Sequence, residues 1–397
     1  MRNNRSFSGN KNYNNPGRRN QGGGRKQSIF DPSHIILQAQ QTQVNFVAAP
    51  EYEAEHQFSD FAISPQLKAN ILNRGYTTPT PIQDQVIPHV LENRDVVGIA
   101  NTGTGKTAAF LIPLLDKVLG NPEEKVLIIA PTRELALQVR DELKLFTTGF
   151  RVFATLCIGG ASISRQIDDL KRGQQFVIGT PGRIKDLNER GKLKFEQFTT
   201  IVLDEVDRML DMGFVHEIKR IIQALPPKRQ SLFFSATMTN SVKVVMSEFL
   251  HNPVHVSVRT QDTSINVTQE LIKINGRVKV DVLHELLLQE TFQKVLVFGR
   301  TKHAADRLTR ELQYRGVKVN TIHGNKSQGQ RERALKQFKN NYINVLIATD
   351  VVARGVDIKD ISHVINFDLP ESYESYIHRI GRTGRADKKG VALTFVD

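Results

Sequence analysis

The stretch Gly98-Ile99-Ala100-Asn101-Thr102-Gly103-Thr104-Gly105-Lys106-Thr107 decides the fold of the first half of the chain. An apolar run at residues 96–99 leads into it, and a helix-forming run at residues 108–115 follows it. A strand, a glycine-rich turn, a lysine and a threonine before a helix form the pattern with which proteins surround a triphosphate. Backbone N–H groups of the turn and the helix N-terminus would face the phosphates. We therefore expect residues 100–107 to bind a nucleotide, with Lys106 on the outer phosphates and the Thr107 hydroxyl on Mg²⁺.

The composition limits the kind of protein that this chain can form. Its 397 residues are enough for two or three domains, and 39% of them are hydrophobic, which is ordinary for a globular protein. The single cysteine, Cys157, excludes an internal disulfide and a zinc site built from several cysteines. The sequence has no secretory signal and no apolar run near the ~18 residues that cross a membrane. We therefore expect a soluble, cytoplasmic protein with no membrane partner.

The charge distribution indicates a polyanionic partner. The net charge is +13, and residues 1–30 contain seven Lys and Arg residues but no Asp or Glu. Residues 1–29 are otherwise mostly Asn, Gly and Ser, so they cannot bury enough apolar surface to offset the entropy of ordering, and we expect a disordered basic tail. Such a tail suits a flexible tether for nucleic acid and a solubilising segment equally well. Residues 30–56 form an N-terminal extension to which no function is assigned.

Short apolar runs alternate with helical stretches from residue 57 onward. The runs are rich in Val and Ile, as expected for strands buried on both faces, and the alternation predicts a parallel, doubly wound sheet. We expect one α/β domain over residues 57–257, a linker over the polar residues 258–267, and a second α/β domain over residues 268–397. The predicted strands lie near residues 96–99, 126–129, 152–156, 176–178, 201–203 and 232–234, and near residues 271–274, 295–298, 317–322, 345–347, 364–367 and 391–395.

Two acids follow an apolar run of the first domain, at the edge where such sheets bind ligands. Asp204 comes directly after the run at residues 201–203, so we expect it to lie beside the phosphate loop and to hold Mg²⁺ together with Thr107. The next acid, Glu205, can orient or deprotonate the attacking water. The first domain therefore carries the residues expected for ATP hydrolysis.

The second domain has no phosphate loop but contains a cationic cluster, His378-Arg379-Ile380-Gly381-Arg382-Thr383-Gly384-Arg385. Arg382 and Arg385 are three residues apart, so at a helix start they would face the same way. Arginines in this arrangement suit contact with the γ-phosphate. The pattern predicts a site that is complete only when the two domains meet.

Many stretches match the motifs of one family in order. Gly75-Tyr76-Thr77-Thr78-Pro79-Thr80-Pro81-Ile82-Gln83 is similar to its Q motif, and Phe58 stands at the spacing of its upstream aromatic residue. Further matches fall at residues 98–107, 131–136, 159–160, 180–183, 204–207, 235–237, 296–301, 328–331, 348–357 and 376–385. From residue 58 to residue 397 the chain therefore resembles a DEAD-box RNA helicase of helicase superfamily 2, a family with two RecA-like domains.

The resemblance implies roles for further residues. Gln83 would read the adenine edge, which a carboxamide can do because adenine presents an adjacent donor and acceptor. Phe58 would pack on the base, and Asp357 would contact the ribose. Asp207, Ser235, Thr237 and His378 would couple the ATP site to the RNA site. The phosphates and sugars of the RNA strand would be contacted by Pro131, Thr132, Arg133, Gly160, Thr180, Arg183, Arg300, Thr301, Gly324, Gln328, Arg331 and Thr349. Such contacts do not select a base sequence, and the family's contact with the 2′-hydroxyl implies RNA rather than DNA.

The sequence departs from the family pattern at few positions. Val206 stands where the name-giving motif has Ala, Asn325 replaces a common Asp, and Arg300 lies where the family varies most. The sequence ends at Asp397, directly after the last predicted strand, where family members continue with a further helix. We therefore expect either a trimmed fragment or a second domain with an exposed apolar face and low stability.

The resemblance implies an enzyme whose ATP hydrolysis is stimulated by RNA. Closure of the two domains on ATP–Mg²⁺ and a single strand would bend that strand and separate a few base pairs of a duplex. Two alternatives stay open: an ATP-gated RNA clamp or remodelling scaffold without unwinding, and a DNA-directed helicase of the same superfamily. We expect a monomer, and the compact domains without insertions favour a bacterial cytoplasm. The sequence names neither the RNA nor a protein partner.

Overall fold

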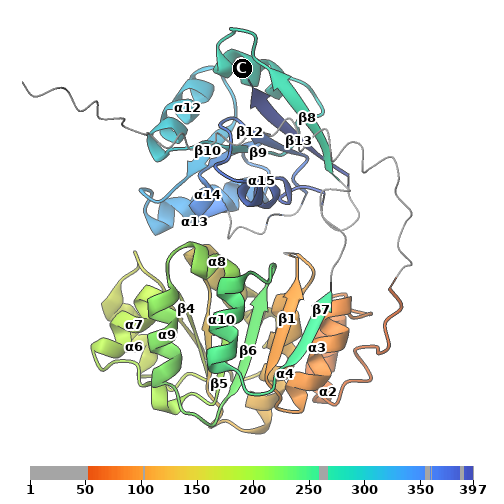
Figure 1. Ribbon diagram of the computed structural model, residues 1–397, viewed down its shortest axis with the longest axis vertical. Helices are drawn as coiled ribbons and strands as arrows, with labels where there is room; N and C mark the ends of the chain where they lie inside the picture. Colours follow the sequence, from red (N-terminus) through yellow and green to blue (C-terminus); the bar gives the residue numbers. More distant parts are fainter. Residues whose placement is uncertain are drawn as a thin grey trace, which may run out of the picture.

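The computed structural model describes residues 52–101, 103–258, 267–353, 358, 360–384 and 389–396. The predicted tail, most of the predicted N-terminal extension and nearly all of the predicted linker lie outside the described residues. Three predicted site residues, Thr102, Asp357 and Arg385, also lie outside them. Two α/β units follow one another along the described chain, each built around its own sheet (Figure 1).

The first unit is built on a seven-stranded sheet in which every neighbouring pair of strands is parallel. The strand order is β3-β4-β2-β5-β6-β1-β7. The parallel, doubly wound sheet predicted from the apolar runs is therefore confirmed. The strands are β1 Val96–Ala100, β2 Val126–Ile129, β3 Ala154–Cys157, β4 Phe176–Gly179, β5 Thr200–Leu203, β6 Gln230–Ser235 and β7 Val254–Val258.

Helices cover both faces of the first sheet because alternate residues of each strand point to opposite faces. Val126 and Ile128 of β2 pack into one apolar cluster together with α2, α3, α4 and part of α5. Leu127 and Ile129 of the same strand pack into a second cluster with α7, α8, α9 and α10. The helices are α2 Pro65–Asn73, α3 Pro81–Leu91, α4 Lys106–Gly120, α5 Arg133–Phe146, α6 Ile163–Leu170, α7 Pro181–Glu189, α8 Val206–Asp211, α9 Val215–Ala224 and α10 Asn240–Phe249, with a 3₁₀ turn at Phe195–Gln197.

Strand β7 was not predicted. It pairs with β1 at the edge of the sheet, and only the central residue, Val256, is buried. A strand that is half exposed does not produce the continuous apolar run on which the other predictions rested. The alternation Val-His-Val-Ser-Val is the signal that was available in the sequence.

The second unit repeats this architecture on a six-stranded sheet with the order β10-β11-β9-β12-β13-β8, again with parallel neighbours throughout. Its strands are β8 Val267–Lys273, β9 Val295–Phe298, β10 Val319–Ile322, β11 Val345–Ala348, β12 His363–Asn366 and β13 Gly390–Val396. Its helices are α11 Lys279–Leu287, α12 Lys302–Tyr314, α13 Gln328–Lys339, α14 Asp350–Ala353 and α15 Tyr373–Ile380. Alternate residues again fill two clusters, for example Val297 on one face and Leu296 on the other.

The boundaries of some strands differ from the predicted ones. Strand β8 begins at Val267, four residues before the predicted run, because its polar residues alternate with buried ones along an edge strand. Within the described ranges, no helix combines the length and the apolar character needed to cross a lipid bilayer.

Candidate active site

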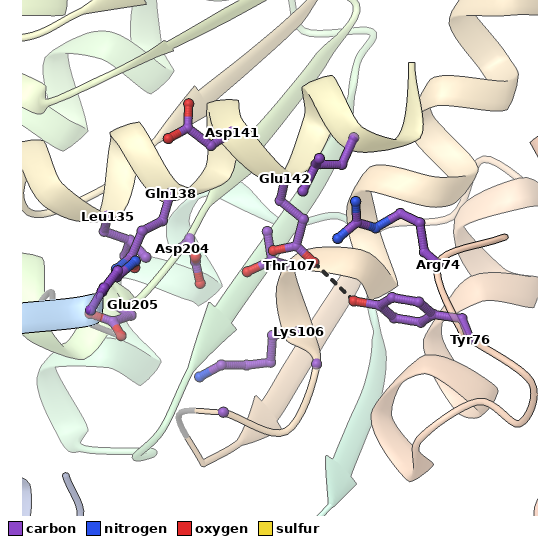
Figure 2. Close-up of a pocket in the computed structure, with 14 residues that line it drawn as sticks. Arg74, Tyr76, Lys106, Thr107, Leu135, Gln138, Asp141, Glu142, Asp204 and Glu205 are labelled. Carbon is purple, nitrogen blue, oxygen red and sulfur yellow. Dashed lines mark hydrogen bonds between the residues drawn. The ribbon is translucent and has the colours of Figure 1, made fainter. Parts of the chain in front are cut away.

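The glycine-rich loop lies between β1 and α4, as its sequence predicts. It borders a cleft of about 390 Å³, whose far wall is formed by α5 (Figure 2). The side chains of Lys106, Thr107, Asp204 and Glu205 all face this cleft. The cleft is lined by Arg74, Tyr76, Gly103, Gly105, Lys106, Thr107, Leu135, Gln138, Asp141, Glu142, Leu145, Asp204, Glu205 and, from the second unit, Lys339.

The start of α3 holds the loop in shape. The Thr80 hydroxyl donates to the Thr104 carbonyl (2.8 Å), and Gln83 Nε2 donates to the Gly105 carbonyl (3.1 Å). Gly105 has φ +93°, and a Cβ at this position would lie 2.4 Å from Gln83 Nε2. Only glycine fits both the backbone conformation and this close approach. The loop is therefore shaped by hydrogen bonds from another element and not by its own sequence alone.

Two residues predicted to contact the base are buried in this structure. The Gln83 side chain also accepts from the Thr80 backbone N–H (2.9 Å), so both ends of its amide are engaged by protein. Phe58 has no exposed surface and packs edge-on against Phe61 and Tyr76. Tyr76 itself lines the cleft and donates to Glu142 (3.4 Å). Their contacts with adenine stay predictions.

The residues predicted to hold Mg²⁺ fit that ion. Burial raises the pKa of the Asp204 carboxyl to about 7, although the positive charge of Lys106 acts in the opposite direction. Asp204 Oδ1 is buried and has no hydrogen-bond partner among the described residues. A buried carboxylate oxygen without a protein partner fits a ligand of a cation. Within the described chain no cluster of three or more His, Cys, Asp or Glu residues could hold a metal ion. A hydroxyl from Thr107 and one carboxylate from Asp204 are nevertheless sufficient for Mg²⁺, which keeps waters and substrate phosphates as its other ligands.

Lys106 and Glu205 carry opposite charges at the same cleft. Lys106 Nζ donates to the Ala100 carbonyl (2.7 Å) at the beginning of the loop, and Thr104 donates to the Asn101 carbonyl (2.8 Å). Glu205 precedes α8 in the left-handed conformation (φ 54°), which is uncommon for a residue with a Cβ. Burial disfavours the charged form of Glu205, but the positive charges of Arg208, Lys106 and Arg382 outweigh it and lower its pKa. Glu205 is therefore held as a carboxylate.

The predicted coupling residues of the first unit lie in one hydrogen-bonded group. Asp207 Oδ2 accepts from the backbone N–H of Ala236 (3.1 Å) and from both the N–H (2.8 Å) and the hydroxyl (2.9 Å) of Thr237. The Ser235 hydroxyl donates to the Thr237 carbonyl (2.8 Å). The group connects α8, which follows Glu205, to the end of β6. A displacement of either segment would therefore move the other.

Helix N-termini dominate the edges where the predicted RNA contacts lie. Thr132, Thr180 and Thr301 are the N-caps of α5, α7 and α12, which follow β2, β4 and β9. Backbone N–H groups at such N-termini favour phosphate. Most residues predicted to contact RNA are at least partly exposed: Arg133, Gly160, Thr180, Arg183, Arg300, Thr301, Gly324 and Thr349. The others, Pro131, Thr132, Gln328 and Arg331, are buried. These edges suit a sugar–phosphate backbone.

A buried ion pair joins the two units. Arg331 Nη2 of α13 donates to Glu134 Oε2 of α5 at 2.6 Å, and the side chains of both residues are less than a tenth exposed. Arg331 was predicted to contact RNA, but in this structure Glu134 engages it, so its contact with RNA stays a prediction. The pair connects residues 197 positions apart in the sequence.

The position of Arg382 corrects one prediction. We expected it at a helix start, but α15 ends at Ile380, and Arg382 lies in the turn after the helix. The interleaved Gly381 and Gly384 end the helix instead of opening one, and Gly384 has φ +67°. Arg382 is buried, and its Nε donates to the His378 carbonyl (3.1 Å). Its positive charge contributes to lowering the pKa of Glu205 in the first unit.

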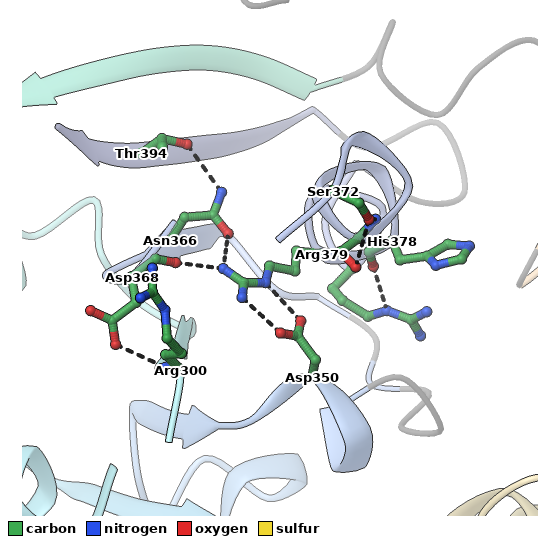
Figure 3. A network of polar contacts seen from close by, with 10 residues as sticks. Arg300, Asp350, Asn366, Asp368, Ser372, His378, Arg379 and Thr394 are labelled. Atoms are coloured by element: carbon green, nitrogen blue, oxygen red, sulfur yellow. Dashed lines mark hydrogen bonds and ion pairs between the residues drawn. The ribbon is translucent and has the colours of Figure 1, made fainter. Parts of the chain in front are cut away.

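A buried arginine that the sequence analysis gave no role organises this part of the second unit (Figure 3). Arg379 is 1% exposed and binds both oxygens of Asp350 (2.7 Å each). It also donates to Asn366 Oδ1 (3.2 Å) and to the Asp368 carbonyl (2.6 Å), and its guanidinium lies 5.0 Å from the Phe298 ring centre. Arg379 thus fixes α15 against α14 and the end of β12.

We expect Arg379→Met to destabilise the second unit by about 3 kcal/mol, because it leaves Asp350 without its partner in a mostly buried site. Urea unfolding of the full chain measures the loss. Arg315→Met, which removes surface ion pairs with Asp281 and Glu311, should lower the stability far less, because solvent screens exposed ion pairs. Equal losses for the two variants would contradict the role assigned to Arg379.

A second polar group anchors the first described residues to the helix that carries Gln83. Asp84 Oδ2 accepts from the Tyr52 hydroxyl and from the Glu55 backbone N–H (2.7 Å each), and His56 Nδ1 lies 2.7 Å from Asp84 Oδ1. Burial opposes the ionisation of Asp84, but the hydrogen bonds from Tyr52 and His56 outweigh it and lower its pKa. The carboxylate therefore stabilises the folded state.

This depressed pKa gives a prediction with a definite pH window. The stabilising contribution of Asp84 should be complete above the unfolded-state pKa of about 4 and should disappear as the pH falls through the lower folded-state pKa. Asp84→Asn should therefore cost about 2 kcal/mol at pH 7 and much less near pH 3, measured by urea unfolding. Glu196→Gln, at an exposed acid of the 3₁₀ turn, serves as the control. A loss that does not depend on pH would contradict the prediction.

Comparisons with known proteins agree with this geometry. Residues 80–245 match the family model described as DEAD/DEAH box helicase, and residues 278–387 match the helicase conserved C-terminal domain. The chain is 44% identical over 341 residues to the ATP-dependent RNA helicase CshA of Listeria monocytogenes, covering 85% of this chain and 66% of that protein. It is 46% identical to the DEAD-box ATP-dependent RNA helicase CshA of Bacillus licheniformis, covering 85% of this chain and 70% of that protein. The chain thus spans about two thirds of the length of these relatives.

Solved structures extend the likeness to the whole described fold. Dbp5 of S. cerevisiae bound to RNA and ADP BeF3 superposes with a TM-score of 0.75 at 32% identity, covering 85% of this chain and 89% of that one. Mss116p bound to ssRNA and AMP-PNP superposes with a TM-score of 0.77 at 26% identity, covering 88% of this chain and 77% of that one. Both matches include the two parallel-sheet units and support the two RecA-like domains predicted above.

Proposed function

Because the chain belongs to the DEAD/DEAH box helicase family, we propose that it is an ATP-dependent RNA helicase whose ATP hydrolysis requires both domains and a bound RNA strand. The observation that carries the proposal is that side chains of both units meet beside one cleft. The phosphate loop and Glu205 line the cleft from the first unit, and Lys339 lines it from the second. Arg331 of the second unit pairs with Glu134 of the first, and the charge of Arg382 acts on Glu205.

The ATP site is assigned as follows. Backbone N–H groups of the loop and the N-terminus of α4 bind the phosphates, and Lys106 neutralises their outer oxygens. Thr107 and Asp204 would hold Mg²⁺, which would neutralise negative charge on the phosphates. Glu205, kept as a carboxylate, orients the attacking water and accepts its proton. Arg382 stabilises the negative charge that develops on the transferred γ-phosphoryl group.

The RNA site is assigned to the edges that carry the helix N-termini. The N-termini of α5, α7 and α12 bind backbone phosphates, assisted by Arg133, Arg183 and Arg300, and these contacts do not select a sequence. Such a surface spans both units, so a single strand holds them in the arrangement that completes the ATP site. The group formed by Asp207, Ser235 and Thr237 transmits movement between the RNA edge and α8.

The test is steady-state ATP hydrolysis by the full chain with and without single-stranded RNA, followed by strand separation of a short RNA duplex. We expect RNA to stimulate hydrolysis and the duplex to separate in an ATP-dependent manner. An equal response to matched DNA would assign a DNA-directed helicase instead. Hydrolysis with persistent RNA binding and no strand separation would assign a clamp. We also propose action in the bacterial cytoplasm, since the relatives named above are bacterial proteins.

A further inference from the structure

Arg208, which has no role in the proposed mechanism, is buried beside the proposed water-activating residue. Its side chain is 6% exposed, and Nη1 donates to Glu205 Oε2. Its other donors, Nε and Nη2, are also buried and have no hydrogen-bond partner among the described residues. A buried guanidinium with unused donors is costly unless another acceptor becomes available to it.

Glu134 is the acid that this guanidinium can also serve. Strands β2 and β5 are neighbours with Ile129 opposite Leu203, and Glu134 and Arg208 each follow these residues by five positions. The two residues therefore lie in the first turns of the helices that follow adjacent strands, at the same edge of the sheet. Burial raises the pKa of Glu134, and the charges of Arg331, Arg133 and Arg208 act in the opposite direction. Glu134 Oε2 binds Arg331, while Oε1 is buried without a hydrogen-bond partner among the described residues.

Arg133, the remaining cation, is directed elsewhere. Its guanidinium packs against the backbone of Gly159 and Gly160, where a Cβ on Gly160 would lie 2.1 Å from Nη1. Of the two first-unit arginines whose charge acts on Glu134, Arg208 is thus the one with buried donors that lack a partner among the described residues. Removal of Arg331 would leave Glu134 as a buried carboxylate without its ion pair, and such a group costs several kcal/mol unless a cation replaces the lost one.

We propose that Arg208 is a positioning residue shared between Glu134 and Glu205, and that Arg331 of the second domain releases it to Glu205 by taking Glu134. When the domains are apart, Glu134 attracts Arg208 and the Glu205 carboxylate loses its anchor. When they meet, the ion pair between Arg331 and Glu134 leaves Arg208 to hold Glu205 toward the cleft. This inference rests on the proposed role of Glu205 and adds the route by which domain contact reaches it.

The test is a double-mutant cycle on kcat of the full chain, with ATP and single-stranded oligo(U) RNA both saturating. Arg331→Ala should lower RNA-stimulated kcat about 10-fold, because Glu134 then competes for Arg208. Glu134→Gln should keep RNA-stimulated kcat within about 2-fold and raise RNA-independent hydrolysis about 3-fold, because no acid competes. The double variant should recover to within about 3-fold of Glu134→Gln.

An ion pair that only holds the two domains together predicts the opposite pattern of kcat values. If Arg331 and Glu134 only hold the domains together, Glu134→Gln should be as damaging as Arg331→Ala, and the double variant should show no recovery. That result would overturn the proposal. Arg208→Gln should lower kcat about 100-fold with the KM for ATP within about 2-fold, and Arg208→Lys should restore part of the loss. Arg220→Gln, at an exposed arginine of α9, is the matched control.

The cycle also separates this inference from the proposed function. If Glu205→Gln retains hydrolysis, the assignment of Glu205 itself fails. If Glu205→Gln is inactive while Glu134→Gln and Arg331→Ala lose the same activity, the role of Glu205 stands and only the sharing of Arg208 is wrong.

Discussion

Glu205→Gln is expected to lower RNA-stimulated ATP hydrolysis by about 100-fold or more while ATP remains bound. The carboxylate is kept ionised by Arg208, Lys106 and Arg382 against the effect of burial, so it can accept a proton at neutral pH. An amide of the same size keeps the packing but cannot accept that proton. Rapid-mixing measurements of hydrolysis and titration with a fluorescent nucleotide separate the two effects.

The controls for this variant are chosen from the same domain. Glu196→Gln, at an exposed acid in the 3₁₀ turn, should hydrolyse ATP at the parental rate. Thermal unfolding should show that Glu205→Gln remains folded. Full activity in the Glu205 variant would remove this residue from the chemistry and leave the attacking water without an assigned base.

Arg382→Ala is the second variant with a large expected effect, a loss of about 10³-fold in RNA-stimulated kcat. The arginine is buried in the turn after α15, where its Nε donates to the His378 carbonyl, and its positive charge acts on Glu205. Its contribution belongs to the transition state, so the KM for ATP should change much less than kcat. Steady-state kinetics at saturating RNA measure both constants.

A lysine at position 382 tests whether the positive charge alone is sufficient or whether the planar shape of the guanidinium is also needed. Arg382→Lys keeps the positive charge but loses the planar pair of donors, and it should recover only part of the activity. Arg310→Ala, at an exposed arginine of α12, should be unaffected. Equal kcat values for Arg382→Ala and the parent would remove Arg382 from the reaction.

Local sequence patterns were sufficient to predict the two sheets and the positions of the residues proposed to bind the nucleotide. Buried parallel strands such as β2 and β11 read as continuous apolar runs, and the residues after them were therefore correctly placed at one edge. Lys106, Thr107 and Glu205 lie within one or two residues of a strand end or a helix start, so short spacing fixes their positions. The half-exposed edge strand β7 lacked this signal and was missed.

Contacts between distant residues could not be predicted in the same way. Arg379 and Asp350 are 29 positions apart, and Arg331 and Glu134 are 197 positions apart. No periodicity links such pairs, because their proximity depends on how the helices pack on the sheets. The same holds for Asp84, whose partners Tyr52 and His56 precede it by 32 and 28 positions and lie outside any repeating pattern. The family resemblance supplied roles for motif residues, but not for these partners.

The last strand of the first unit and the first strand of the second unit lie on the same side of the molecule (Figure 1). Strand β7, the last of the first unit, and strand β8, the first of the second, are both edge strands, whereas α13 packs on β10 at the opposite edge of the second sheet (Figure 1). If the second unit turns about this flank, Arg331 is at the end of a long lever arm. A small rotation of the second unit then displaces Arg331 more than residues near the flank. Because of this distance, the ion pair between Arg331 and Glu134 can oppose the rotation with a small force. A pair of spectroscopic labels on α5 and α13 would consequently register opening more sensitively than labels placed near the pivot.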